Sequence, residues 1–190
     1  MQVKSAGILT KDSMMSSLQY LKPDFLTLSY PHPLWSSLDG NPYQTKAARI
    51  QALFLAGKYP TERFRRFWTG NTNGYCLFLP CFTLKKYESS EHMLLHCPEH
   101  SEERRRLGAF VLDMLRENHF LLQIVPLIRD DIEDEEKMQF LTDCSVLPKV
   151  IEATQIYGEI VHQLCFKISR TWCRSIHVAR SKKLGRYSRD

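Results

Sequence analysis

The chain has 190 residues, of which 43% are hydrophobic, 11% aromatic and 25% charged, and its formal net charge is +5. This composition is typical of a globular protein with a core of its own, and it excludes a disordered or fibrous chain. No apolar run reaches the roughly 18 residues of a membrane-spanning helix, and the first residues lack the pattern of a secretory signal. We therefore expect an intracellular protein, in the nucleus or the cytoplasm, that does not insert into a membrane.

Residues 1–44 show little periodicity and contain several residues that interrupt regular structure: Pro23, Pro31, Pro33, Gly40 and Pro42. Proline and glycine at this density are typical of loops. We expect an extended leader of low order, with at most one short helix before Lys22.

From Thr45 the pattern changes, and we expect residues 45–118 to form a helical zinc-binding module. The segment 45–57 places apolar residues on one helical face and ends at Gly57, a candidate C-cap. Thr61 is the expected N-cap of a second helix. The spacing of its aromatic residues favours a buried face made of Phe64, Phe67 and Trp68.

The most informative pattern is C-x4-C-x10-H-x4-C, formed by Cys76, Cys81, His92 and Cys97. Two thiolates on a short turn, followed by an imidazole and a third thiolate, are the donors that one tetrahedral Zn²⁺ ion requires. Such a closed site holds structure and leaves no open position for chemistry. We therefore predict Zn²⁺ at these four residues, with Ser89 or Ser90 capping the short helix that carries His92.

Two alternatives concern the cysteines and histidines. Six cysteines could form three disulfides in an exported protein, but Cys144, Cys165 and Cys173 lie in apolar helical stretches where free thiols behave as small hydrophobes. His96 and His100 lie close enough to replace His92. His96 directly precedes Cys97, which is a poor geometry for chelation, so we favour His92.

Downstream of Pro98, Ser101 is the expected cap of an amphipathic helix with apolar residues in register at Leu107, Phe110, Val111, Met114 and Leu115. Residues 119–147 form an acidic connecting segment, with a short helix expected in EEKMQFLTDC. For residues 148–190 we expect one long helix that starts at Pro148 and bends at Gly158, followed by a basic tail. The fold class is thus mainly α: a small zinc-knuckle-like subregion embedded among amphipathic helices, with one long C-terminal helix.

Clusters of cations suggest contacts with phosphates, because Lys and Arg supply the sequence-independent part of nucleic-acid binding. The alternative is that each cluster is the solvated face of a helix. The candidate residues are Arg63, Arg65, Arg66, Arg104, Arg105, Arg106, Arg170, Arg174, Arg180, Lys182, Lys183 and Arg186. We find no phosphate-binding loop, nucleophile elbow, metalloprotease helix or paired carboxylates in a credible setting, so we expect no enzymatic activity.

Residues 30–185 resemble the C-terminal zinc-binding region of reverse-transcriptase polyproteins from non-LTR (LINE-type) retrotransposons. The resemblance rests on ARIQALFLAGKYPTERFRRFW, GYC, the CxxxxC spacing and ESSEHMLLHCPEHSEERRRL, and extends to LTDCSVLPKVI and FKISRTWCRSIH. It implies that Cys76, Cys81, His92 and Cys97 bind zinc and that the region helps to handle template RNA or target DNA. Endonuclease and polymerase motifs of such polyproteins are absent from this sequence, so polymerase activity is not carried over.

The sequence therefore favours a zinc-stabilised module that binds RNA or DNA and is related to part of a retrotransposon polyprotein. A second hypothesis is a structural or protein-interaction domain whose helices once packed against the polymerase domain of a parent polyprotein, which would leave an exposed apolar patch. A third is a fragment of such a polyprotein without a function of its own.

Overall fold

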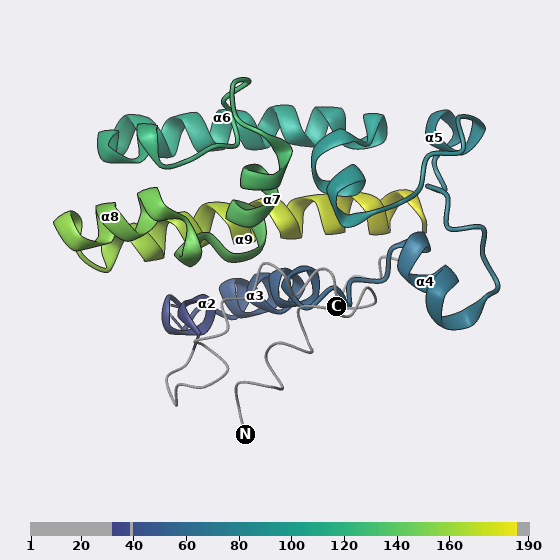
Figure 1. The fold of residues 1–190 in the computed structure, drawn as a ribbon, viewed down its shortest axis with the longest axis horizontal. Helices are drawn as coiled ribbons and strands as arrows, with labels where there is room; N and C mark the ends of the chain where they lie inside the picture. Colours follow the sequence, from purple (N-terminus) through teal and green to yellow (C-terminus); the bar gives the residue numbers. More distant parts are fainter. Residues whose placement is uncertain (1–31, 39, 186–190) are drawn as a thin grey trace.

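A computed structural model describes residues 32–38 and 40–185, and in this part of the chain the regular structure is helical (Figure 1). The only β pairing among these residues is an isolated antiparallel bridge between Tyr75 and Tyr87. The prediction of a mainly α fold is confirmed. The helices are α2 (Pro33–Ser36), α3 (Pro42–Leu55), α4 (Glu62–Thr69), α5 (Leu79–Thr83), η3 (His92–His96), η4 (Pro98–His100), α6 (Ser101–Glu117), η5 (His119–Gln123), α7 (Asp134–Asp143), η6 (Cys144–Val146), α8 (Pro148–Tyr157) and α9 (Ile160–Lys183).

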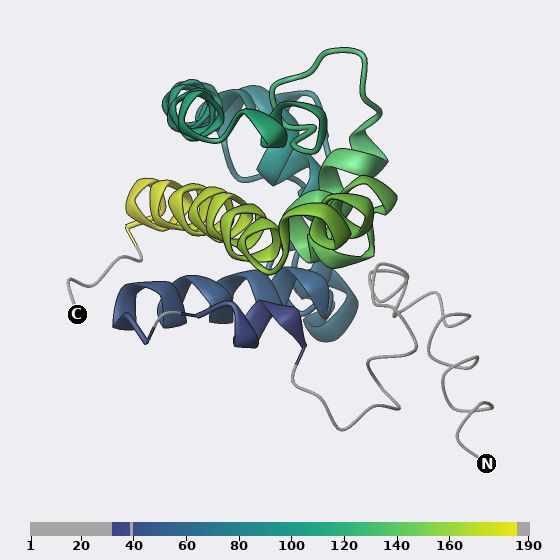
Figure 2. The ribbon, with the colours of Figure 1, turned by 90° about the vertical axis from the view of Figure 1, so that its left-hand side faces the viewer.

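Helix α9 is the centre of the fold. It lies between α6 on one side and α3 on the other, and α7 and α8 also pack against it (Figures 1 and 2). Its sequence explains this position, because apolar residues recur around much of the helix and a helix that is apolar on most sides is buried. The buried residues of α9 include Val161, Cys165, Phe166, Ile168, Trp172, Cys173 and Ile176. They form one hydrophobic core with residues of α3, α6, α7 and α8.

Helices α4 and α6 form in the predicted segments, but Ser101 is the first residue of α6 and not its cap, because His100 holds the N-cap position without a side-chain hydrogen bond. Thr61 caps α4 by accepting a hydrogen bond from the amide of Phe64 at 3.1 Å. In α6 the predicted apolar register is confirmed, since Leu107, Val111, Met114 and Leu115 are buried and Phe110 is partly buried. Helix α7 begins one residue before the segment predicted for it and ends inside it, and its residues Met138, Phe140 and Leu141 add to the core.

The expected leader needs correction where the structure describes it. Helix α3 begins at Pro42, capped by Asn41, and the short helix α2 precedes it with Leu34 fully buried. Proline at the first position of a helix lacks only an amide that would be unpaired there anyway, so Pro33 and Pro42 start helices instead of preventing them. The rest of the expected leader, residues 1–31, lies outside the described residues.

The single long helix expected from residue 148 is wrong in detail. Gly158 adopts φ 76° and ψ −165°, a conformation that side-chain-bearing residues avoid, and it separates α8 from α9. The two helices pack against each other. The expected bend at Gly158 is therefore a complete break, after which α9 forms the long C-terminal helix.

The aromatic residues of α4 also differ from the prediction. Phe67 is 65% exposed and Trp68 is 58% exposed, while Phe64 is partly buried. The spacing correctly brings Phe64 and Trp68 together, with 5.9 Å between ring centroids, but it does not say whether a helix face meets the core. The residue of α4 that is buried is Glu62, on the other side of the helix.

Candidate metal centre and cationic groove

The first two cysteines of the motif lie in a compact turn between residues 74 and 88. Its two ends are joined by hydrogen bonds from the amide of Cys76 to the carbonyl of Lys86 at 2.8 Å and from the amide of Glu88 to the carbonyl of Gly74 at 3.0 Å. Gly74 has φ 77°, so a glycine suits this position. Helix α5, inside the turn, carries Cys81. This closure brings Cys76 and Cys81 to the same side.

The second pair of ligands lies on a turn of π-helix, η3. The amide of Cys97 donates to the carbonyl of His92 at 2.6 Å, a contact between residues five positions apart. The wide turn places His92 and Cys97 on one face, which an ordinary α-helix would not do for this spacing. Ser89 starts the turn by accepting a hydrogen bond from the amide of His92 at 3.0 Å, as predicted.

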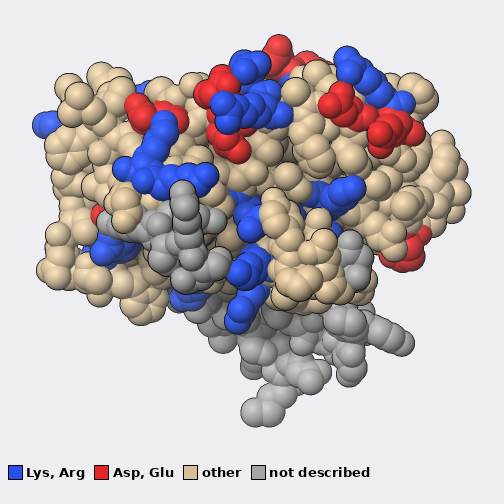
Figure 3. Space-filling model, turned by 180° about the vertical axis from the view of Figure 1, so that it is seen from behind, with Lys and Arg blue, Asp and Glu red and all other residues tan. Residues whose placement is uncertain are grey.

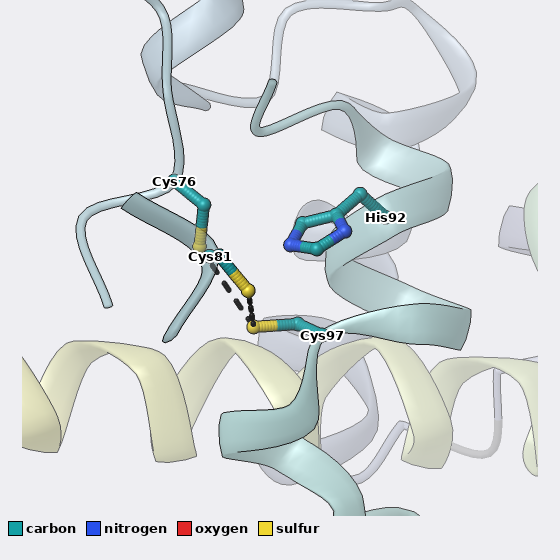
Figure 4. A group of neighbouring side chains, drawn as sticks. All are labelled: Cys76, Cys81, His92 and Cys97. Atoms are coloured by element: carbon teal, nitrogen blue, oxygen red, sulfur yellow. Dashed lines mark hydrogen bonds between the residues drawn. The ribbon is translucent and has the colours of Figure 1, made fainter. Parts of the chain in front are cut away.

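The four predicted ligands converge (Figure 4). One donor atom from each of Cys76, Cys81, His92 and Cys97 lies within 4.8 Å of all the others, and all four residues are buried. The Sγ atom of Cys97 is 3.8 Å from that of Cys76 and 4.0 Å from that of Cys81. This group can hold a metal ion.

Two observations fit a metal ion at this place. The Nε2 atom of His92 is buried and has no hydrogen-bond partner in the protein. A buried polar atom without a partner is costly, and a ligand bond would satisfy it. In addition, the hydrogen bond from Cys76 lowers the pKa of the Cys97 thiol, and the same bond together with burial raises the pKa of Cys76. Burial also raises the pKa of the Cys81 thiol, so the lowered pKa favours the thiolate, the form in which cysteine binds metals, at Cys97 alone.

The residues around the ligands form a separate small cluster. Cys76, Phe78, Cys81 and Cys97 pack together, with Leu184 against them, apart from the main hydrophobic core. Three of these four buried side chains are the candidate cysteine ligands, so little other apolar surface is buried around them. A metal ion would supply the missing cross-link between the two halves of the motif.

The alternative histidines lie elsewhere. His96 is exposed, and its Nε2 atom is 2.8 Å from Asp134 and 3.8 Å from Glu91, so it joins η3 to α7 at the surface. These three exposed or partly exposed residues form a second group with metal-binding side chains. His100 is buried edge-on against Phe78, with 5.2 Å between ring centroids. His92 is therefore the histidine that faces the cysteines.

An ion pair that the sequence did not indicate attaches the segment that carries the candidate metal ligands to α9. Arg180 donates to both carboxylate oxygens of Glu88, from Nε to Oε1 and from Nη2 to Oε2, each at 2.8 Å. Glu88 also accepts from the amide of Glu62 at 2.6 Å, at the start of α4. Farther along, Trp172 donates to the carbonyl of Leu94 at 3.2 Å. No pattern in the sequence distinguishes Glu88 from a surface glutamate.

Four of the predicted phosphate-binding residues come together in one groove. Arg106 of α6 and Arg174, Lys182 and Lys183 of α9 line it, together with Tyr43 and Glu103. The guanidinium of Arg174 lies 3.5 Å from the centre of the Tyr43 ring. Seen from behind, lysine and arginine side chains extend across the middle of the molecule, while acidic side chains lie mostly along the upper edge (Figure 3).

Two predicted phosphate ligands are wrong, because Arg170 and Arg180 are buried at 2% and 3% exposure. Arg170 donates to Gln44 and to Ser37, and so ties α9 to the beginning of the described chain. Both arginines lie on the face of α9 that packs against other elements. The sequence shows that these residues are charged, but not whether their side chains face solvent or the interior of the protein.

The other predicted cations have mixed surroundings. Arg63 and Arg66 are exposed beside an open pocket, whereas Arg65 is half-buried and pairs with Glu62 at 3.1 Å. Arg105 and Arg106 are exposed and both pair with Glu102. Arg104 is half-buried, and burial lowers its pKa. Arg186 lies outside the described residues.

Within the described residues no helix is long and apolar enough to cross a membrane. Comparisons with protein-family models, with curated proteins and with solved structures found no match.

Proposed function

We propose that this chain is a zinc-stabilised module that binds nucleic acid, in keeping with its resemblance to the zinc-binding region of retrotransposon reverse transcriptases. Zinc is favoured by the donor set and by its spacing. A tetrahedral site with Zn–S bonds of about 2.3 Å has sulfur–sulfur edges of about 3.8 Å. The two sulfur–sulfur distances to Cys97 are 3.8 and 4.0 Å.

In this proposal the metal has a structural role. Three thiolates and one imidazole complete a four-coordinate site, so no position remains open for a substrate. The chain supplies the ligands from two separate turns, residues 74–88 and η3, and a bound ion would fix one against the other. Binding free energy in such a site becomes folding free energy of the segment around it.

The observation that carries the binding proposal is the cationic groove. Arg106 belongs to α6, and Arg174, Lys182 and Lys183 belong to α9, yet all four line the same groove. Several of them have acidic partners, such as Glu102 for Arg106 and Glu99 for Lys183. Exposed ion pairs of this kind are weak, so a phosphate group can replace the carboxylate at little cost.

A charge reversal with a matched control tests this function. Arg106 and Arg116 both lie on α6, are exposed, and pair with an acidic residue one turn earlier, Glu102 and Asp113 respectively. Only Arg106 lines the groove. We expect Arg106→Glu to weaken binding to a labelled duplex oligonucleotide and to reduce the salt dependence of log affinity by about one unit, as loss of one phosphate contact does.

The Arg116→Glu variant should retain wild-type affinity and salt dependence in the same fluorescence-anisotropy titration. If the wild-type chain does not bind nucleic acid at low salt, or if both reversals have the same effect, the groove is not a nucleic-acid site. The salt series is essential because phosphate contacts release counterions and weaken steeply as salt rises.

A protein-interaction domain is the second candidate, and one observation favours it. Four apolar residues within the turn that holds Cys76 and Cys81 are exposed: Leu77, Leu79, Phe82 and Leu84. Exposed apolar residues gathered in one segment are typical of surfaces that contact another protein. Sedimentation of the purified chain tests this reading, since a monomer at every concentration and in mixtures with candidate proteins would count against it.

A further inference from the structure

A second surface with exposed aromatic rings and cations lies on α4 and shares no lining residue with the groove that the proposed function uses. An open pocket there is lined by Arg63, Arg66, Phe67 and Tyr87. Its residues come from α4 and from the end of the 74–88 turn. The pocket therefore joins two elements that the buried Glu88 also connects, through its contact with the amide of Glu62.

The aromatic rings of this surface are open to solvent. Phe67 is 65% exposed, the adjacent Trp68 is 58% exposed and Tyr87 is 48% exposed. Large aromatic side chains gain free energy when they are buried, so the two open rings that line the pocket, Phe67 and Tyr87, provide contact area for a ligand. Lys58 lies 4.9 Å from the Trp68 ring, and so adds a positive charge beside α4, outside the residues that line the pocket.

The charge of the surface selects the ligand. Residues 58–90 contain six cations, namely Lys58, Arg63, Arg65, Arg66, Lys85 and Lys86, and two acids, Glu62 and Glu88. Both acids are buried, at 2% and 0% exposure. Glu88 is neutralised by Arg180, and Glu62 by Arg65. The exposed charge of this segment is therefore entirely positive, which favours an anionic ligand over a typical protein surface.

The guanidinium of Arg66 is already positioned. Its Nη1 atom donates to the carbonyl of Asn73 at 3.1 Å and to the hydroxyl of Tyr87 at 3.3 Å. The guanidinium carbon is 5.9 Å from the centre of the Tyr87 ring. A cation held beside an open aromatic ring requires little reordering when a ligand binds.

We propose that this pocket binds a single strand of nucleic acid, with unpaired bases stacking on Phe67 and Tyr87 and phosphates contacting Arg63 and Arg66. Aromatic platforms combined with cations are the usual means of binding single strands, because every base presents a flat face. Bases inside a duplex are already stacked on one another and cannot reach the rings. The inference rests on the proposed function and adds to it a site that distinguishes single strands from duplexes.

Three probes separate base stacking from phosphate binding: a labelled DNA single strand of about a dozen nucleotides, the corresponding duplex, and an abasic strand with the same phosphates but no bases. The full chain, loaded with metal, is titrated against each. The variant is Phe67→Ala. The matched control is Phe82→Ala, which removes an exposed phenylalanine of α5 that does not line the pocket.

We expect Phe67→Ala to reduce affinity for the single strand about 10-fold, the usual effect of losing one stacked base. Its affinity for the duplex and for the abasic strand should remain that of the wild type. Phe82→Ala should bind all three probes like the wild type. Tyr87→Ala should also weaken single-strand binding, but with some loss on the abasic strand, because the Tyr87 hydroxyl helps to position Arg66. Circular dichroism checks that each variant folds.

Two results would overturn the inference. One is an unchanged single-strand affinity in Phe67→Ala while Arg106→Glu still weakens binding, which leaves the proposed function intact and removes the stacking site. The other is an equal loss on all three probes, which would show that Phe67 acts through folding or phosphate contacts. Absence of binding to every probe by the wild type would reject the proposed function together with this inference.

Discussion

Arg180, near the end of α9, and Glu88, at the end of the turn that carries Cys76 and Cys81, form a buried ion pair with two hydrogen bonds of 2.8 Å. Glu88 also lies near the start of α4, where it accepts from the amide of Glu62. A charged pair in this position links the segment that carries the candidate metal ligands to the central helix. Any change that leaves one member unpaired puts an uncompensated charge inside the protein.

The first prediction concerns this pair. We expect Arg180→Met to reduce the free energy of unfolding by about 3–5 kcal/mol, because the Glu88 carboxylate would remain buried without its cation. Arg105 also makes two hydrogen bonds of 2.8 Å to a glutamate, Glu102, but at the surface. Arg105→Met should therefore leave stability almost unchanged. Urea denaturation of both variants measures the difference, and equal effects would show that burial of the pair is not important.

The second prediction tests the exposure of α4. We expect Phe67→Ala to change the free energy of unfolding by less than about 0.5 kcal/mol, as is usual for surface substitutions. Phe54 is 2% exposed and stacks on Tyr59, with ring centroids 4.0 Å apart. Phe54→Ala should cost about 3–5 kcal/mol, since it leaves a cavity in the core. A large loss of stability in Phe67→Ala, measured by the same denaturation, would show that this face of α4 is buried.

The third prediction uses two glycines with opposite expectations. Gly158 has φ 76°, so Gly158→Ala should destabilise the protein by about 1–3 kcal/mol through backbone strain. Gly108 lies within α6, and a Cβ atom there would meet no neighbour within 4 Å. Gly108→Ala should stabilise the protein by about 0.5–1 kcal/mol, because alanine favours the helix. Thermal unfolding of the two variants should show melting temperatures shifted in opposite directions; shifts of the same sign would contradict the break at Gly158.

The fourth prediction concerns pH. Burial, reinforced by nearby cations, lowers the pKa of His100 from 6.5 to about 4. The folded protein therefore binds fewer protons than the unfolded chain between these values, and stability present above about pH 6.5 is lost as the pH falls towards 4. For this residue the loss between about pH 7 and pH 5 is about 1–2 kcal/mol.

His100→Phe provides the comparison, because neither ring nitrogen of His100 has a hydrogen-bond partner in the protein and the ring packs against Phe78. The variant keeps all four predicted metal ligands, so any release of metal at low pH affects both proteins. We expect its stability to decrease less between pH 7 and pH 5 than that of the wild type. Parallel pH profiles of the unfolding free energy would show that His100 does not titrate on unfolding.

Most helices and the four converging candidate ligands could be predicted from the sequence, because these features depend on local patterns. Thr61 and Ser89 cap helices where their side chains can reach the first amides, and the C-x4-C and H-x4-C spacings each lie within one turn. The direction of a helix face was harder to predict. Phe67 and Arg170 each lie on an amphipathic helix, but whether a face meets the core depends on which elements pack against it.

Long-range pairings could not be predicted for the same reason. Arg180 and Glu88 are separated by 92 positions in the sequence, and each alone resembles a surface charge. The groove that unites Arg106 with Arg174 likewise depends on α6 and α9 lying side by side. The break at Gly158 is a local effect, but glycine within a helical pattern is compatible with a bend, a cap or a break.

Native mass spectrometry of the purified chain tests the central claim most directly. We expect one zinc ion per chain in the wild type, none in Cys81→Ser, and one in the control Cys173→Ser. Cys173 is as buried as Cys81 but lies on α9, in the main hydrophobic core. Addition of a strong chelator should remove the ion from the wild type. A wild-type chain expressed with ample zinc yet free of metal, or a Cys81→Ser variant that retains a full equivalent, would contradict the assignment of Cys76, Cys81, His92 and Cys97 as a zinc site.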